Sequence, residues 1–160
     1  MRLTVIALIV GVIAAAGVAC AGDDNAASTN GGLRVVELRY EGGTLRVEVA
    51  ETPTQRALGL GGRDGLAEGT GMLFDLGSTR VPTFSMRGMR FGLDFVWIDE
   101  RKRVTAVTSD VPPQPGVRDS ELESYSPETP VRYVLEVAAG TAERLGIDAG
   151  DQLAFELQAQ

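Results

Sequence analysis

The chain has 160 residues and a formal net charge of −7, from 22 Asp and Glu against 15 Lys and Arg, so we expect one ordinary domain with a tail and no nucleic-acid partner. Its single cysteine and its lack of histidine exclude an internal disulfide, catalysis by Ser-His-Asp or Cys-His groups, and the usual zinc sites. We therefore expect no metal and no cofactor.

The N-terminal segment has the pattern of a secretory signal. Residues 3–22 carry no charge and follow Arg2, and small residues precede Cys20. A basic start, an apolar run and small residues before a cleavage site are typical of a signal peptide. The run Ala16-Gly17-Val18-Ala19-Cys20 resembles a bacterial lipobox, which implies a signal peptide over residues 1–19 and a lipid on Cys20.

Two other interpretations of this segment stay open. Residues 3–22 are long enough to remain as an uncleaved membrane anchor. Alternatively, cleavage after an alanine would release a soluble, secreted protein. All three interpretations place the domain outside the cytoplasm. Residues 20–32 are small and polar and predict a flexible tether. Residues 33–160 then form a single domain.

A hairpin and a short helix are predicted at the start of the domain. Apolar and polar residues alternate on both sides of Glu41-Gly42-Gly43, as in a half-buried hairpin. The apolar positions are Val36, Leu38, Tyr40, Leu45, Val47 and Val49. Thr52-Pro53-Thr54-Gln55 is a capping box with proline at the first helical position, and Gly59 is expected to end the helix.

Four more strands follow from the apolar pattern. Residues 93–98 (LDFVWI) are continuously apolar apart from one acid, which is typical of a central strand. Residues 104–108 predict its hairpin partner after a charged turn. Residues 133–137 and 153–157 alternate apolar and polar positions, so each predicts a strand with one buried face.

A long loop and a second helix separate these later strands. Residues 110–130 hold five of the seven prolines and show no periodicity, so they predict a loop that is either functional or simply solvated. Residues 141–146 (TAERLG) predict a short helix, with Thr141 as N-cap and Gly146 in the left-handed position at its end.

The fold class follows from these elements. About eight strands with two short helices predict a mainly β, compact sandwich or barrel. Roughly 125 residues are enough to bury a hydrophobic core.

Several linked motifs resemble those of one family. Residues 52–60 (TPTQRALGL) resemble its TPEERARGL segment, and Gly71-Met72-Leu73-Phe74 resembles its GMLF. Residues 84–99 are similar to its FWMK…LDIIFID, and residues 132–147 to its RYVLEV…GTAERLGI. The chain therefore resembles the domain of unknown function 192 family over roughly residues 45–157.

The resemblance implies a jelly-roll-like β domain, often behind a signal or membrane anchor. It implies no reaction, because the biochemical function of the family is not established. This chain departs from the pattern at three positions: Ser85 stands for Trp, Gly88 for Asn and Gly92 for Pro. Loss of the Trp could enlarge a pocket, or it could mark a change of ligand.

A group of arginines is the leading candidate for a binding site. Arg56, Arg63 and Arg87 are expected near Asp94, and guanidinium groups bind carboxylates or phosphates in a bidentate manner. The loop around Arg87 adds Met89 and Phe91, which could touch a partner. The structural alternative is an ion-pair network of Arg56 and Arg87 with Asp94 and Glu136, which would pin the helix to the sheet.

The carboxylates offer a weaker candidate. A catalytic pair for glycoside hydrolysis could be drawn from scattered acids, but the sequence gives no distance between them. These acids are Asp94, Asp99, Glu136, Glu143 and Asp151.

The expected function is a non-catalytic binding module held at the membrane by the N-terminal lipid or anchor. Its ligand would be a small acidic or saccharide molecule of the cell envelope, or a partner protein. A carboxylate-using hydrolase or isomerase of envelope material, and a structural or assembly accessory of the envelope, are the alternatives.

Overall fold

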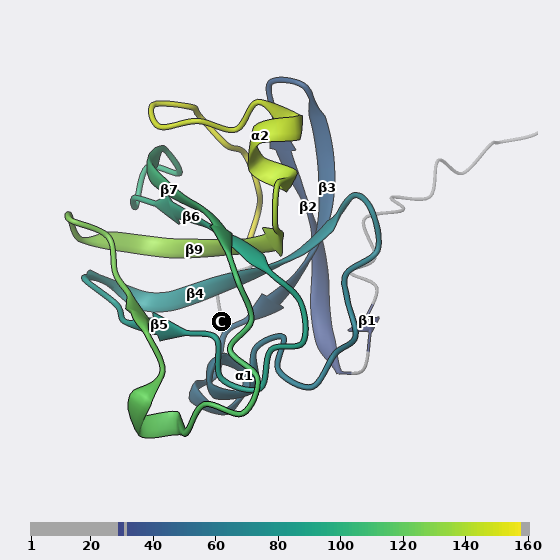
Figure 1. The fold of residues 1–160 in the computed structure, drawn as a ribbon. Helices are drawn as coiled ribbons and strands as arrows, with labels where there is room; N and C mark the ends of the chain where they lie inside the picture. The colour runs from purple at the N-terminus through teal and green to yellow at the C-terminus, as the bar shows by residue number, and fades with distance from the viewer. Residues whose placement is uncertain (1–28, 31, 158–160) are drawn as a thin grey trace, which may run out of the picture.

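The computed structural model describes residues 29–30 and 32–157 of the chain (Figure 1). The predicted signal peptide, the cleavage site and Cys20 lie outside the described residues. At the end of the predicted tether, Thr29–Asn30 pairs with Leu33 and Arg34 as a two-residue strand. No helix in the described part of the chain combines the length and apolarity needed to cross a bilayer.

Nine strands and three short helices form the described chain. The main sheet contains β1 (Thr29–Asn30), β2 (Leu33–Tyr40), β3 (Gly43–Ala50), β4 (Thr70–Arg80), β6 (Leu93–Ile98), β7 (Val104–Val111) and β9 (Val131–Ala138). A small second sheet pairs β5 (Phe84–Ser85) with β8 (Ser124–Tyr125). The helices are α1 (Pro53–Leu58), the 3-10 helix η1 (Asp119–Glu121) and α2 (Thr141–Leu145).

The prediction of a mainly β fold with two short α-helices is confirmed. The main sheet has the order β1-β2-β3-β4-β9-β6-β7, so β1 and β7 are its edges and it is not a closed barrel. All of its strand pairs are antiparallel except β3 with β4. In Figure 1, β2 and β3 stand across the direction of β4, β9 and β6, which shows how strongly the sheet bends.

The C-terminal segment ties the two ends of this bent sheet together. Ala154 bridges to Arg39 in β2, and Gln152 bridges to Arg103 just before β7. Residues 153–157 therefore do not form the regular strand that their alternation predicts. Leu153 and Phe155 are nevertheless buried, so the predicted buried face is correct. The segment is held to the sheet by these buried side chains and by the two isolated bridges.

Two hydrophobic clusters occupy the two faces of the sheet. The first lies under α2 and the C-terminal segment, and it includes Leu38, Val96 and Phe155. The second includes Phe95 and Trp97. Strand β6 supplies both clusters because all six of its residues are buried, as predicted for a central strand. Its neighbours β7 and β9 confirm the predicted strands 104–108 and 133–137.

Local sequence signals account for the first hairpin and α1. Strands β2 and β3 form the predicted hairpin, with Glu41 and Gly42 as its turn and Gly43 already paired with Tyr40. In α1, Thr52 and Gln55 form the complete capping box, and Gly59 ends the helix with a positive φ of 50°. Such a short helix cannot be stable alone, so its packing on the sheet must hold it.

The predicted N-cap of α2 is wrong. Gly140 is the N-cap residue and Thr141 makes no side-chain capping hydrogen bond, although Gly146 ends the helix in the left-handed conformation as predicted. The helix N-terminus is bound instead by a carboxylate from β6. Asp94 accepts hydrogen bonds from the backbone N–H groups of Gly140 and Ala142 at 3.1 and 2.9 Å. A residue 46 positions away therefore replaces the local cap.

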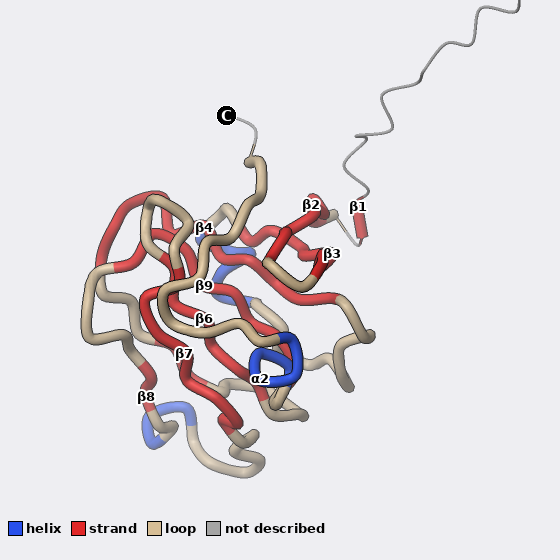
Figure 2. Tube along the Cα trace, turned by 90° about the horizontal axis from the view of Figure 1, so that it is seen from above, coloured by secondary structure: helices blue, strands red, loops and turns tan. Residues whose placement is uncertain are grey.

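The proline-rich loop runs beside the sheet and carries η1 and β8 (Figure 2). Strand β8 pairs with β5 through Phe84–Tyr125 and Ser85–Ser124. This pairing brings the loop residue Asp119 to the face of the sheet that holds the second cluster.

Candidate functional site

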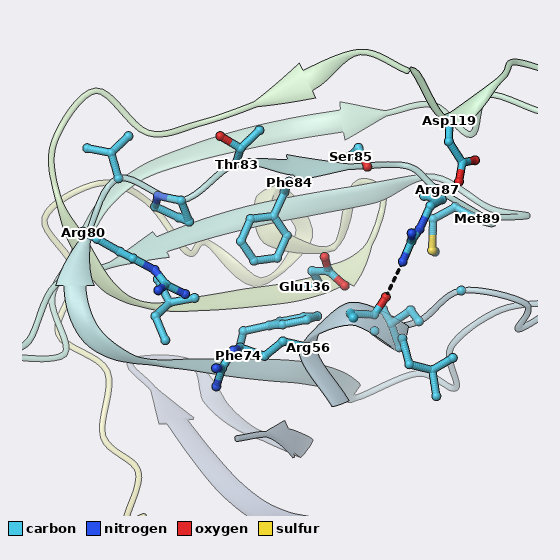
Figure 3. Close-up of a pocket in the computed structure, with 18 residues that line it drawn as sticks. Arg56, Phe74, Arg80, Thr83, Phe84, Ser85, Arg87, Met89, Asp119 and Glu136 are labelled. Carbon is cyan, nitrogen blue, oxygen red and sulfur yellow. Dashed lines mark hydrogen bonds between the residues drawn. The ribbon is translucent and has the colours of Figure 1, made fainter. Parts of the chain in front are cut away.

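A cleft of about 660 Å³ opens on the face of the second hydrophobic cluster (Figure 3). Segments that are distant in the sequence form it: α1, the end of β4, β5, η1 and β9. Its charged and polar lining residues are Arg56, Arg80, Thr83, Ser85, Arg87, Asp119 and Glu136. Its volume lies within the range of small-molecule sites, and its lining combines these polar groups with apolar side chains.

Glu136 lies in the middle of the cleft (Figure 3). It is a central residue of β9, paired with Met72 of β4 and Phe95 of β6, and it is 5% exposed. Within the described residues, nothing forms a hydrogen bond or an ion pair with its carboxyl group. Its oxygens are accessible from the cleft rather than sealed in the core.

The protonation of Glu136 follows from this burial. Desolvation raises the pKa of the Glu136 carboxyl from 4.5 to about 8, because the charged form loses its hydration and gains no partner. The carboxyl group is therefore mainly neutral at pH 7. A raised pKa in a cleft is a frequent mark of a functional site.

Arg56 holds α1 to the sheet and faces the cleft. Its Nη1 donates to the backbone carbonyls of Glu51 and Asp75, the latter at 2.8 Å. Because both partners are neutral carbonyl groups, the positive charge of Arg56 is not neutralised by them.

Arg80 and Arg87 lie on opposite sides of Glu136 in Figure 3. Arg87 donates from Nη2 to the carbonyl of Ala57 at 2.9 Å, and both arginines are exposed. Among the described residues, neither of them nor Arg56 has an ion-pair partner, although Asp119 lines the same cleft. Three guanidinium groups thus give the cleft a locally positive character in an acidic protein.

Apolar side chains form part of the cleft lining. Phe74 and Phe84 meet edge to face with ring centroids 5.1 Å apart, and Phe84 also lies 5.8 Å from Trp97. Leu58 and Val81 stand at the rim with 70% and 51% of their surface exposed. A ligand that reached the rim would cover the exposed side chains of Leu58 and Val81, which are costly to leave in water.

Three of the six ligand-binding residues predicted from the sequence meet in this cleft. Arg56, Arg87 and Met89 line it, whereas Arg63, Asp94 and Phe91 do not. Arg63 pairs with Glu48 beside a second cavity of about 350 Å³ near β3 and β4.

Asp94 has a structural partner set of its own. It is fully buried, and it accepts a third hydrogen bond from the N–H group of Asp110 at 2.9 Å in addition to the two from α2. The ion-pair network considered as an alternative is not formed among the described residues, because Arg56 and Arg87 bind carbonyl groups and Asp94 binds backbone N–H groups.

Sequence reasoning gave Glu136 only a minor role, as an arginine partner or a scattered acid. The sequence signal for Glu136 is an acid within the apolar segment VLEV, because an unpaired buried charge is costly.

Ser85 lies exposed beside the cleft, and its neighbours Phe84 and Met86 are the more buried residues of this segment. A Trp at this position would therefore stand at the rim of the cleft rather than at its floor.

One family model matches most of the chain, and two solved structures are similar to it. The DUF192 family model, described as an uncharacterized ACR, matches residues 36–155. A solved structure from Sinorhizobium meliloti 1021, described as a candidate transcription regulator, is 34% identical, covers 76% of this chain and 92% of its own, and has a TM-score of 0.66. A protein of unknown function from Novosphingobium aromaticivorans DSM 12444 is 28% identical, with 76% and 84% coverage and a TM-score of 0.66. No curated protein matches the chain.

Proposed function

This chain belongs to the DUF192 family, whose description assigns no activity, and we propose that it is a binding module whose cleft takes a small acidic or saccharide ligand. The observation that carries the proposal is the set of three cleft arginines without ion-pair partners in the described chain. In a protein with a net charge of −7, such a concentration of unneutralised positive charge is suited to an anion.

The residue types around the cleft support this ligand class. Guanidinium groups recognise carboxylate and phosphate oxygens with paired hydrogen bonds. The half-buried ring of Phe84 provides aromatic surface for the apolar face of a sugar ring or of another organic acid.

A thermal-shift screen of small organic acids and monosaccharides tests the proposal. We expect at least one compound to raise the melting temperature of the wild type. Arg80→Ala should weaken binding of that compound by about tenfold, the value of one lost charge-assisted hydrogen bond. Arg101→Ala is the matched control, because Arg101 is also exposed and lies away from the cleft. Equal affinity of wild type and Arg80→Ala, or equal weakening in both variants, would contradict the assignment.

We further propose that the module works outside the cytoplasm, tethered by a lipid on Cys20. The support is the signal-like sequence before Cys20. Lipoproteins carry more than one acyl chain, which is enough for stable anchoring. Intact-mass spectrometry of the protein from membranes of its bacterial host should show a diacylated or triacylated N-terminus at Cys20. A chain that retains Met1 would contradict the lipid anchor on Cys20.

A hydrolase is the second candidate, because the cleft holds two carboxyl groups. Glu136 carries a proton at neutral pH, as a general acid must, and Asp119 enters from η1. We rank binding first because Asp119 belongs to an exposed three-residue helical turn and has no positioning partner in the described chain. We do not propose DNA binding for this chain, because its net charge of −7 does not favour a nucleic-acid partner.

A further inference from the structure

Among the described residues, Glu136 is the one buried polar side chain that faces the cleft, and it indicates which ligand groups the cleft can bind. Glu136 is held in position because its strand, β9, is paired with β4 on one side and with β6 on the other. Its carboxyl group is nine-tenths or more buried, is aimed into the cleft, and is without a partner among the described residues. Burial removes most of the hydration of this carboxyl group, and no described residue compensates with a hydrogen bond. A ligand atom that completes its hydrogen bonding would recover that loss.

We propose that the Glu136 carboxyl group is a ligand-binding group that donates a hydrogen bond to a neutral oxygen of a sugar acid, whose carboxylate lies against the cleft arginines. This inference rests on the proposed binding function of the cleft. It adds a binding residue and joins the two open ligand classes, acid and saccharide, into one molecule.

The charged groups around Glu136 fix the direction of the hydrogen bond. They are Arg56 from α1, Arg80 from β4, Arg87 beyond β5 and Asp119 from η1. None of the three arginines is ion-paired with Glu136, so burial dominates and the pKa of the carboxyl is raised. A neutral carboxyl group can donate its O–H, which a carboxylate cannot. The ligand atom that meets this O–H group is an acceptor, such as a hydroxyl, ring or carbonyl oxygen.

The shape of the cleft agrees with a molecule of this kind. Its volume of about 660 Å³ exceeds that of a single pyranose ring and lies within the range of small-molecule sites. The Phe84 ring lies above Glu136 in Figure 3, so a ring-shaped ligand would contact the aromatic face while its oxygens reach the carboxyl group. In Figure 3, Arg80 and Arg87 lie on either side of this position and Arg56 lies below it, so the carboxylate of such a ring has guanidinium groups near it.

Two probes separate the roles of the acid and of the hydroxyl groups. D-glucuronate has a six-membered ring, a carboxylate and several oxygen acceptors, whereas cyclohexanecarboxylate has a similar ring and carboxylate without those acceptors. Binding of both is measured by calorimetry at about pH 7 and about pH 9.5, on either side of the Glu136 pKa. The variants are Glu136→Gln, which keeps a neutral donor, and Glu136→Leu, which keeps only the approximate volume.

We expect the wild type to prefer glucuronate at about pH 7 by tenfold or more, and Glu136→Leu to lose that preference. Glucuronate affinity of the wild type should fall more than tenfold towards about pH 9.5, because the donor is lost and a second negative charge appears. Glu136→Gln should bind glucuronate at both pH values within about threefold of the wild type at pH 7.

The outcomes distinguish this inference from the proposed function. If glucuronate binds wild type and Glu136→Leu equally and with the same pH profile, the role of Glu136 is wrong and the cleft remains the site. If the wild type binds neither probe, the sugar-acid assignment is wrong. The proposed function then survives only if another acid from the thermal screen binds and is lost in Arg80→Ala. Circular dichroism of the variants confirms that each is folded.

Discussion

The unfolding free energy of Glu136→Gln minus that of the wild type is expected to be about 5 kcal/mol larger at pH 9 than at pH 4. The native carboxyl group has a pKa of about 8, whereas the unfolded group has its ordinary value of 4.5. Between these values the native state keeps a proton that the unfolded state has released. Wild-type stability therefore falls as the pH rises through this window, by about 1.4 kcal/mol per unit. The amide of Glu136→Gln does not titrate, so the variant does not show this fall in stability with pH.

Chemical denaturation of both proteins at intervals of one pH unit checks this expectation. The informative quantity is the difference in unfolding free energy between variant and wild type, because all other titrations cancel in it. Glu128→Gln serves as control, since Glu128 is exposed in the proline-rich loop, and its difference should stay constant within about 0.5 kcal/mol. A constant difference for Glu136→Gln as well would mean that Glu136 is ionised at neutral pH in the native protein.

Asp94→Ala is expected to lower the unfolding free energy by about 3–5 kcal/mol at pH 7. The carboxylate accepts backbone hydrogen bonds from Asp110, Gly140 and Ala142, and an unsatisfied buried N–H group costs about 1–3 kcal/mol. Asp94→Asn should lose less, because one carbonyl oxygen can still accept from two of the three groups.

Urea denaturation measures the unfolding free energies of the wild type and of both Asp94 variants. Asp64→Ala is the control, because the side chain of Asp64 is 90% exposed and its ion pair with Arg90 is on the surface. We expect the control to change stability by less than about 1 kcal/mol. A loss of the same small size in Asp94→Ala would show that water or another group replaces the carboxylate, and that α2 does not depend on it.

The elements of this fold could be predicted where their signals are local. The capping box at Thr52–Gln55, the β2–β3 turn and the buried strand 93–98 each depend on residues within a few positions of one another. The missed features depend on distant partners. Thr141 has the right residue type for an N-cap, but Asp94 from strand β6 accepts the hydrogen bonds at the start of α2. Nothing in the sequence near Thr141 indicates this.

The candidate site could be predicted only in part, for the same reason. The cleft exists because the β5–β8 pairing and the β4–β9 pairing bring Arg87, Asp119 and Glu136 to one face. Residue types identified Arg56 and Arg87 as anion-binding candidates, but they could not distinguish them from Arg63, which pairs with Glu48 elsewhere. The burial of Glu136 without a partner is a property of the assembled sheet.

The central claim is that the cleft between α1, β5 and β9 is the ligand site. An amide NMR titration with the acid that gives the largest thermal shift tests it most directly. We expect the shifts to concentrate on Ala57, Phe84, Arg87 and Glu136, at a saturable 1:1 stoichiometry. Shifts concentrated instead on Arg46, Arg63 and Thr70, around the second cavity, would contradict it.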